Sequence, residues 1–205
     1  MTEGVRRRTF LLSGLAGGIA AAGLLPSQGM AQPSPEAVFD DPAGPVLGNP
    51  EGDVTIVEYF DYQCPYCKTN HPVLKELVRR DGRIRLLPKD WPIFGAASLR
   101  ASQMALGAHR DGRYAQAHDA LMTAQGPLDA TRIDRILDRA GLSPQTVEAS
   151  YNRNRGDLDA YLGRNAAQAA GFGFPGTPAF IVGFTLYPGA LDRRALQEAV
   201  ARARR

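Results

Sequence analysis

The sequence predicts an α/β fold in which a run of helices interrupts a β-sheet. Three observations predict it: a strand, helix, strand unit over residues 54–87, helical periodicity from about 95 to 171, and a return to strand-like residues at 179–187. The first pattern is typical of parallel strand pairing. With 205 residues, 44% of them hydrophobic, the chain is long enough to bury one core of domain size.

Residues 1–31 have the features of an export signal. Three arginines at 6–8 precede a weakly apolar stretch over 10–25, which is short for a bilayer-spanning helix. The arginine pair followed by Phe-Leu resembles a twin-arginine signal, and the small residues at 29–31 fit a cleavage site. We therefore expect cleavage near Ala31 and a mature protein in the bacterial periplasm, an oxidising compartment. An uncleaved membrane anchor is the alternative.

Charge and cysteine content exclude several classes of protein. The net charge is +3, and residues 1–31 supply most of it with three arginines against Glu3. Because the remainder has no concentrated positive face, we expect no nucleic-acid partner. Three arginines at 202, 204 and 205 are expected to form a frayed, solvated terminus. Two cysteines in all exclude a disulfide-stapled scaffold and a four-thiolate zinc site.

The elements of the first half follow in order. Residues 32–52 are rich in proline and glycine and should form an extended lead-in. Residues 54–60 (VTIVEYF) are apolar on both alternating faces, which is typical of a strand buried in an α/β sheet. A helix should run from the CPYC motif to Gly82, kinked at Pro72. A second strand over 83–87 should end at Pro88.

Four or five helices are predicted from 95 to 171, inserted between the two parts of the sheet fold (53–94 and 172–205). Asp129 and Ser143 stand where N-caps belong, and Pro144 occupies a first helical position. Strands at 179–182 and 185–187, with a turn at Gly183, and an amphipathic helix over 191–200 complete the chain.

The motif Cys64-Pro65-Tyr66-Cys67 carries the chemistry. A CxxC pair that follows a buried strand and opens a helix is a redox arrangement. Unpaired N–H groups and the helix dipole at that end favour a thiolate and lower a thiol pKa from about 8.5 to about 3.5–7.5. We therefore expect Cys64 to be ionised and exposed, and Cys67, one turn further on, to close a disulfide with it.

Two other interpretations of the pair stay open. The thiols could be buried and inert, or Cys64, Cys67 and His71 could bind Cu(I) or Zn in a metallochaperone. Covalent haem requires C-x-x-C-H and is excluded, because position 68 is lysine. His109 and His118 are expected at the surface or boundary of the helical region.

The segment from Val57 to Cys67 (VEYFDYQCPYC), with Gly176-Thr177-Pro178-Ala179-Phe180 much later, resembles the DsbA family. The match covers about residues 46–203 in the order of elements. The resemblance implies a thioredoxin fold with an inserted helical domain. It also implies a thiol-disulfide oxidoreductase with no cofactor beyond the redox pair and no metal.

Residue roles follow from the same resemblance. Cys64 would be the nucleophile and Cys67 the resolving thiol, with Glu58 a buried acid that moves protons beneath them. A carboxylate in a doubly buried strand is costly unless it has a role or a partner, and an ion-paired structural glutamate is the alternative. Pro178 would be a cis-proline packed on the disulfide, and Thr177 would offer its backbone to an extended substrate.

The inner dipeptide, Pro65 and Tyr66, also belongs to the implied substrate-binding surface. It departs from strongly oxidising relatives, which often carry histidine at the second position, so the direction of the reaction stays open between oxidase and reductase or isomerase. The implied partners are unfolded exported proteins with cysteines and a membrane redox partner. The short segment 32–50 favours a monomer. Trp91 is expected in the core or in a groove, and Phe172 and Phe174 in packing.

Overall fold

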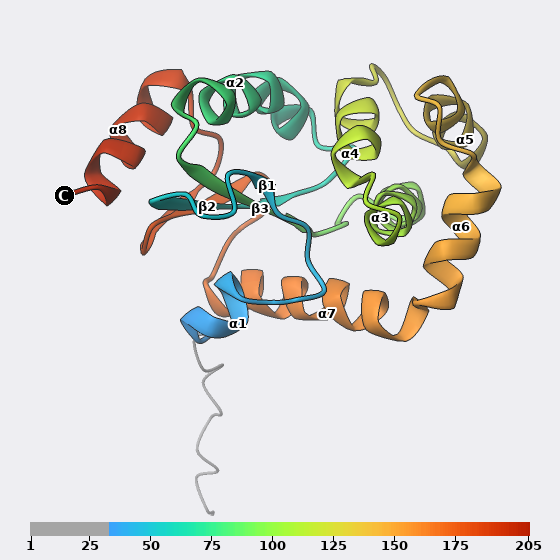
Figure 1. Cartoon of the computed structure of the whole chain (residues 1–205), viewed down its shortest axis with the longest axis horizontal. Coiled ribbons are helices and arrows are strands. Elements are labelled where there is room, and N and C mark those ends of the chain that lie inside the picture. The colour runs from blue at the N-terminus through green and yellow to red at the C-terminus, as the bar shows by residue number, and fades with distance from the viewer. Residues whose placement is uncertain (1–32) are drawn as a thin grey trace, which may run out of the picture.

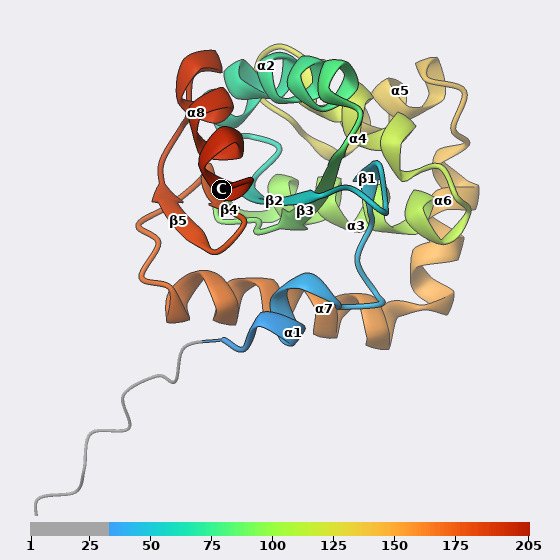
Figure 2. The same ribbon diagram turned by 60° about the vertical axis from the view of Figure 1, so that its left-hand side comes forward.

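The structure is a computed structural model that describes residues 33–205 (Figure 1). The predicted export signal, residues 1–31, lies outside this range. A mixed β-sheet lies between two helical layers, and a further group of helices stands beside it; Figure 2 shows the same layers from another side. Within residues 33–205, no helix is both long and apolar enough to cross a membrane.

The sheet has five strands in the order β1-β3-β2-β4-β5. Strands β2 and β3 are parallel, and the other neighbours are antiparallel. The central strand β2 has the predicted bounds. Its Ile56 packs with Leu74 and Leu196 on one face, whereas Val57 and Tyr59 pack on the other, which explains the continuous apolar run. The strands are β1 (Leu47–Gly48), β2 (Val54–Phe60), β3 (Ile84–Asp90), β4 (Ala179–Val182) and β5 (Thr185–Pro188).

Strand β3 runs past Pro88 to Asp90, so the predicted end of this strand is wrong. The reason lies in its outer neighbour: β1 pairs only with Arg85 and Leu86. Beyond them, no strand of residues 33–205 lies beside the outer edge of β3, so Pro88, which has no N–H to donate, loses no bond to β1. The continued strand carries Trp91 to a point where its N–H donates to the Phe60 carbonyl at 2.9 Å.

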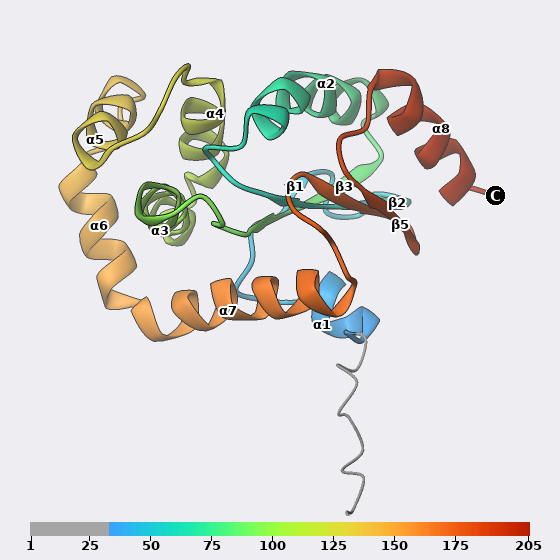
Figure 3. The ribbon, with the colours of Figure 1, turned by 180° about the vertical axis from the view of Figure 1, so that it is seen from behind.

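Helices cover both faces of the sheet. Helices α2 and α8 lie on one face, and α1 and α7 on the other, as Figures 1 and 3 show. Helix α2 continues through Pro72. Helix α1 lies in the expected extended lead-in, because Ser34 accepts the Ala37 N–H at 3.3 Å and Pro35 takes the first helical position. These helices are α1 (Pro35–Phe39), α2 (Pro65–Asp81), α7 (Arg155–Gly171) and α8 (Arg193–Ala203).

The predicted helical region between 95 and 171 contains five helices, the last of which is α7. The predicted N-caps are present: Asp129 accepts the Arg132 N–H at 2.8 Å, and Ser143 accepts the Thr146 N–H at 3.3 Å. The first four helices stand beside the sheet, whereas α7 returns across its face (Figure 3). They are α3 (Ala96–Arg110), α4 (Tyr114–Thr123), α5 (Ala130–Arg139) and α6 (Pro144–Arg153).

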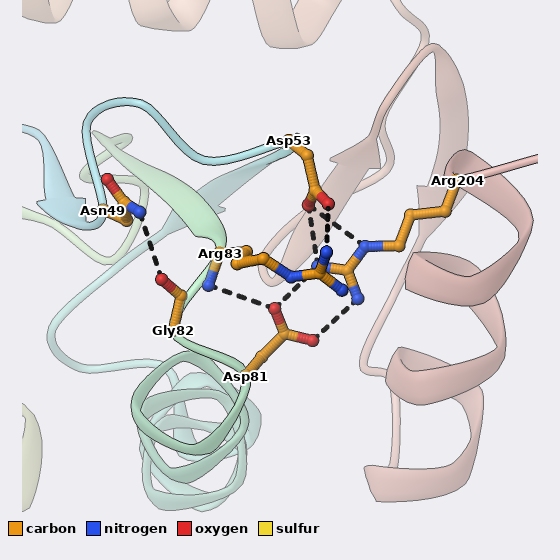
Figure 4. Close-up of polar contacts among 6 residues, drawn as sticks. All are labelled: Asn49, Asp53, Asp81, Gly82, Arg83 and Arg204. Atoms are coloured by element: carbon orange, nitrogen blue, oxygen red, sulfur yellow. Dashed lines mark hydrogen bonds and ion pairs between the residues drawn. The ribbon is translucent and has the colours of Figure 1, made fainter.

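Arg204 is not part of a frayed terminus, which corrects that expectation. Its guanidinium lies between two carboxylates (Figure 4), with Nη2 at 2.7 Å from Asp53 Oδ1 and 2.6 Å from Asp81 Oδ1. Arg204 lowers the pKa of the Asp81 carboxyl by hydrogen bonding to it. Asp53 precedes β2 and Asp81 ends α2. The end of α8 is therefore fixed to two other elements.

Candidate active site

The cysteine pair lies where β2 leads into α2. Cys64 is the N-cap of α2, with extended backbone angles (φ −69°, ψ 117°), and Pro65 holds the first helical position. The Cys64 sulfur accepts the backbone N–H of Cys67 at 3.4 Å. Both residues are free thiols. The local sequence explains this geometry, because proline at N1 is preorganised for a helix start and the cysteine takes the capping position in place of a serine.

Cys64 is covered, so its expected exposure is wrong. Only 1% of the residue is exposed, and its thiol donates to the Thr177 carbonyl at 3.2 Å. The bond between Thr177 and Pro178 is cis. The segment implied by the resemblance therefore lies directly against the reactive sulfur, while Pro65 and Tyr66 remain exposed, Tyr66 by 69%.

The two thiols have opposite pKa shifts. The pKa of Cys64 is lowered to about 6, chiefly because the Cys67 thiol donates a hydrogen bond to its sulfur, with the backbone N–H groups of Cys67 and Tyr66 adding to the effect against burial. Burial strongly raises the pKa of the Cys67 thiol. The lowered pKa favours the thiolate of Cys64 at pH 7 and the raised pKa favours the protonated thiol of Cys67, which is the asymmetry of a nucleophile with a resolving thiol.

Glu58 lies in β2, and only 1% of the residue is exposed. Among residues 33–205 its Oε1 has no hydrogen-bond partner, and no ion pair involves it, so the ion-paired alternative has no support here. Burial, and then the charge of Cys64, raises the pKa of Glu58 to about 8. Glu58 also lines a cavity of about 610 Å³ together with His71 and His118. The raised pKa favours the protonated carboxyl at neutral pH, and the cavity lies beside it.

His71 does not join the cysteines in a metal site. Its Nε2 lies 3.0 Å from Asp119 Oδ1 on α4, and the residue is 6% exposed. Within residues 33–205, no three side chains of the types that bind metals are grouped to hold an ion. The arrangement of the described residues thus does not support the three-ligand site formed with Cys64 and Cys67.

His118 is buried, 3% exposed, which contradicts its expected surface position. Its Nδ1 lies 3.0 Å from the Tyr62 hydroxyl, and its ring stacks on Tyr114 at 5.3 Å. Burial lowers the pKa of His118 to about 3, so the ring is neutral. Helical spacing in the sequence predicts this burial, because His118 lies four residues after Tyr114 on the apolar face of α4. His109 is half-buried, a boundary position as expected.

Three aromatic residues lie close to their expected places. Trp91 is partly buried against the apolar cluster under the sheet. Phe174 packs on Tyr59 with ring centroids 5.5 Å apart, and Phe172 lies 6.5 Å from the same ring. Phe172 and Phe174 therefore serve packing, as predicted.

Asp61 is the site residue that sequence reasoning missed most clearly. It is 0% exposed, and its carboxylate accepts four hydrogen bonds. Oδ1 accepts the Gln63 N–H at 2.7 Å and the Ser98 hydroxyl at 2.6 Å. Oδ2 accepts the N–H groups of Ile93 at 2.7 Å and Phe94 at 3.0 Å. The Asp61 side chain therefore links the turn before Cys64 to Ser98 and to the backbone of Ile93 and Phe94.

Comparison with known proteins agrees with this geometry. A family model described as Thioredoxin matches residues 40–202. The chain belongs to the thioredoxin family. A thioredoxin-like oxidoreductase from Silicibacter pomeroyi DSS-3 is 40% identical, with a TM-score of 0.80 over 84% of this chain and 98% of that one. The recognition of a thioredoxin fold with a helical insertion is therefore confirmed.

Two further structures define the type of thioredoxin-family member. The thiol-disulfide exchange protein α-DsbA2 from Wolbachia pipientis is 28% identical (TM-score 0.76, covering 82% of this chain and 90% of that one). A periplasmic thioredoxin-like protein from Salmonella enterica serovar Typhimurium is 29% identical (TM-score 0.73, 82% and 94%). The described residues thus form a DsbA-like thiol-disulfide oxidoreductase domain.

Curated relatives place a similar segment in a longer protein. The Na(+)/H(+) antiporter NhaA 1 of Salinispora arenicola is 28% identical over 160 residues, which are 77% of this chain. The chain spans about a quarter of the length of the curated relatives it matches, 24% in this case.

Proposed function

We propose that this protein is a periplasmic oxidase that transfers a disulfide between Cys64 and Cys67 to reduced exported polypeptides. The observation that carries the proposal is the low pKa of Cys64, about 6. A stabilised thiolate stabilises the reduced enzyme, which makes the oxidised form a stronger oxidant. The redox pair is the only cofactor that the proposal requires, and no metal takes part.

The proposed reaction has two thiol exchanges. A substrate thiolate attacks Cys64 of the oxidised pair, the bond between Cys64 and Cys67 breaks, and Cys67 leaves with its electron pair. A second substrate thiolate then attacks the substrate sulfur of the mixed disulfide and releases Cys64 as a thiolate. The substrate thereby loses two electrons, which remain on the reduced cysteine pair.

Glu58 would supply the proton that Cys67 needs on leaving. Its pKa of about 8 lies far below the raised pKa of the Cys67 thiol, so proton transfer from the carboxyl to the Cys67 thiolate is downhill. The cavity beside Glu58 would let the carboxyl exchange protons with solvent. This role makes use of a buried carboxyl whose Oε1 has no hydrogen-bond partner among residues 33–205.

The substrate would lie along the segment that covers Cys64. The Thr177 backbone would pair with an extended polypeptide after a small displacement from the sulfur, in the manner of an added strand, and Pro178 would pack against the disulfide. Pro65 and Tyr66 would contact the same polypeptide from the helix side, because both are exposed beside Cys64.

Location and partners complete the proposal. The twin-arginine-like segment and the periplasmic relative from Salmonella enterica support export to the periplasm. A membrane redox partner would reoxidise the pair, and the protein would act as a monomer on exported proteins that contain cysteines.

Trapping and equilibrium experiments test the function and its direction. A Cys67→Ala variant should accumulate mixed disulfides through Cys64 with exported proteins, whereas Cys64→Ala should accumulate none. Equilibration with glutathione should give a reduction potential above about −270 mV, the thioredoxin value. A potential at or below that value would refute the oxidase direction and favour the reductase alternative.

A further inference from the structure

Asp61 accepts the hydrogen bonds that hold the turn leading to Cys64. The Cys64 N–H donates to the Asp61 carbonyl at 3.1 Å, and the Gln63 N–H donates to the Asp61 side chain. A side chain that bonds the backbone two residues on holds such a turn in one conformation. The conformation in which Cys64 enters α2 is therefore set by this residue.

The same carboxylate holds a second segment, residues 91–95, which connects β3 to α3. Its Oδ2 accepts the N–H groups of Ile93 and Phe94. Gln63 adds a parallel link, because its Nε2 donates to the Phe94 carbonyl at 3.2 Å. Two residues of the cysteine turn thus fix the backbone of Ile93 and Phe94.

Ile93 and Phe94 expose apolar surface beside the reactive cysteine. Ile93 is 42% exposed and Phe94 is 50% exposed. The Ile93 Cδ1 lies 4.0 Å from the point that a Cβ on Gly176 would occupy, next to Thr177. Phe94 lines a cavity of about 650 Å³ with Pro65 at the start of α2. We call these two side chains the apolar rim; it borders both the cysteine turn and the Thr177 segment.

We propose that Asp61 is a positioning residue that fixes the apolar rim relative to the Cys64 sulfur. An apolar side chain of a substrate polypeptide that packs on Ile93 or Phe94 then brings a neighbouring cysteine to Cys64. This inference rests on the proposed function and assigns a determinant of its substrate class, polypeptides with apolar residues near cysteine. Hydrogen bonds are directional, and a misplacement of about 1 Å can cost about a hundredfold in rate.

Both carboxylate oxygens are needed, because Oδ1 accepts the Gln63 N–H and the Ser98 hydroxyl while Oδ2 accepts the N–H groups of Ile93 and Phe94. An asparagine at 61 has one acceptor oxygen. Its amide NH₂ must face either the Gln63 N–H or the N–H groups of the rim, and a donor facing a donor separates the segments. Asp61→Asn therefore changes the distance between turn and rim while it keeps the size of the side chain.

The test compares a large and a small substrate. The oxidised Asp61→Asn enzyme is assayed with a reduced unfolded polypeptide that has apolar residues beside its cysteines, and with reduced glutathione. We expect kcat/KM to fall by about tenfold or more for the polypeptide, and the glutathione rate constant to stay within about twofold. Asp81→Asn is the matched control. Asp81 also accepts a backbone N–H two residues on, from Arg83 at 3.2 Å. It lies at the far end of the 17-residue helix α2, about 25 Å from the cysteine turn.

A Phe94→Ala variant tests the route of the effect. If Asp61 acts through the rim, the double variant should be no slower with the polypeptide than the slower single variant. Multiplicative losses, equal losses with both substrates, or an Asp61→Asn rate equal to that of Asp81→Asn would each overturn the inference. Gln63→Leu, which cuts the parallel link together with the Gln63 contacts to the Ser98 hydroxyl and the Leu128 N–H, serves if Asp61→Asn fails to fold; an unchanged substrate preference there would also overturn it.

The outcome separates this inference from the function on which it rests. A wild-type protein that oxidises neither substrate refutes the proposed function, and the inference with it. An active wild-type protein whose Asp61→Asn variant keeps the same preference refutes only the positioning role.

Discussion

Replacing Glu58 by glutamine should make folding stability less sensitive to pH. The pKa of Glu58 is raised from 4.5 to about 8 in the folded protein, first by burial and second by the Cys64 charge. Below pH 4.5 the carboxyl is neutral in both the folded and the unfolded protein, so its burial does not lower the free energy of unfolding. As pH rises toward 8 only the unfolded chain releases the proton, so the wild-type protein loses stability over this range.

The magnitude follows from the two pKa values. At about 1.4 kcal/mol per pH unit, the loss between pH 4.5 and 7 amounts to about 3 kcal/mol. Glu58→Gln keeps the shape of the side chain and does not titrate. Its free energy of unfolding relative to wild type should therefore rise by about 3 kcal/mol from pH 4 to pH 7, whatever constant offset the amide introduces.

Urea unfolding of the reduced proteins at both pH values measures this difference. Titrating groups that do not interact with Glu58 cancel, because they are common to both proteins. Glu51→Gln is the control, since Glu51 is exposed on the loop before β2, and its effect should stay within about 0.5 kcal/mol at each pH. A relative change below about 1 kcal/mol for Glu58→Gln would refute the assignment of a neutral, buried carboxyl.

Three further predictions concern other residues. Cys67→Ala should raise the pKa of Cys64 above 6, because the Cys67 thiol is the main cause of its lowering; pH-dependent alkylation of the variant measures this. Arg204→Ala should lower the free energy of unfolding by about 1 kcal/mol, and by less at high salt. Unfolding in low and high salt measures this, and an equal loss of stability at both salt concentrations would contradict an ionic contact. The ring of His118 should not titrate between pH 5 and 8, since burial holds its pKa near 3; a transition in that range in its NMR resonances would contradict this.

Local patterns predicted what depends on local chemistry. The bounds of β2 were predictable because its apolar residues are consecutive, and the start of α2 because Pro65 follows Cys64. Asp61 and His118 were missed since their partners are remote in sequence: Ile93 is 32 residues from Asp61, and Tyr62 is 56 from His118. Such partners become neighbours only when β2 has been placed beside the inserted helices.

Three corrections depend on how elements that are distant in the sequence lie beside one another. The sequence predicts that Pro88 ends its strand, yet β3 continues because its outer neighbour β1 is only two residues long. The arginines at the C-terminus look solvated in sequence, yet Arg204 meets two carboxylates that lie far from it along the chain. The covered sulfur of Cys64 likewise depends on Thr177, which the sequence places 113 residues away.

The central claim is that Cys64 is a thiolate at neutral pH, and the rate of its alkylation as a function of pH tests this most directly. Measured on the reduced wild-type protein, with Cys64→Ala as the blank, the rate should rise with a midpoint near pH 6. A midpoint near about 8.5, the value of an ordinary thiol, would contradict the account.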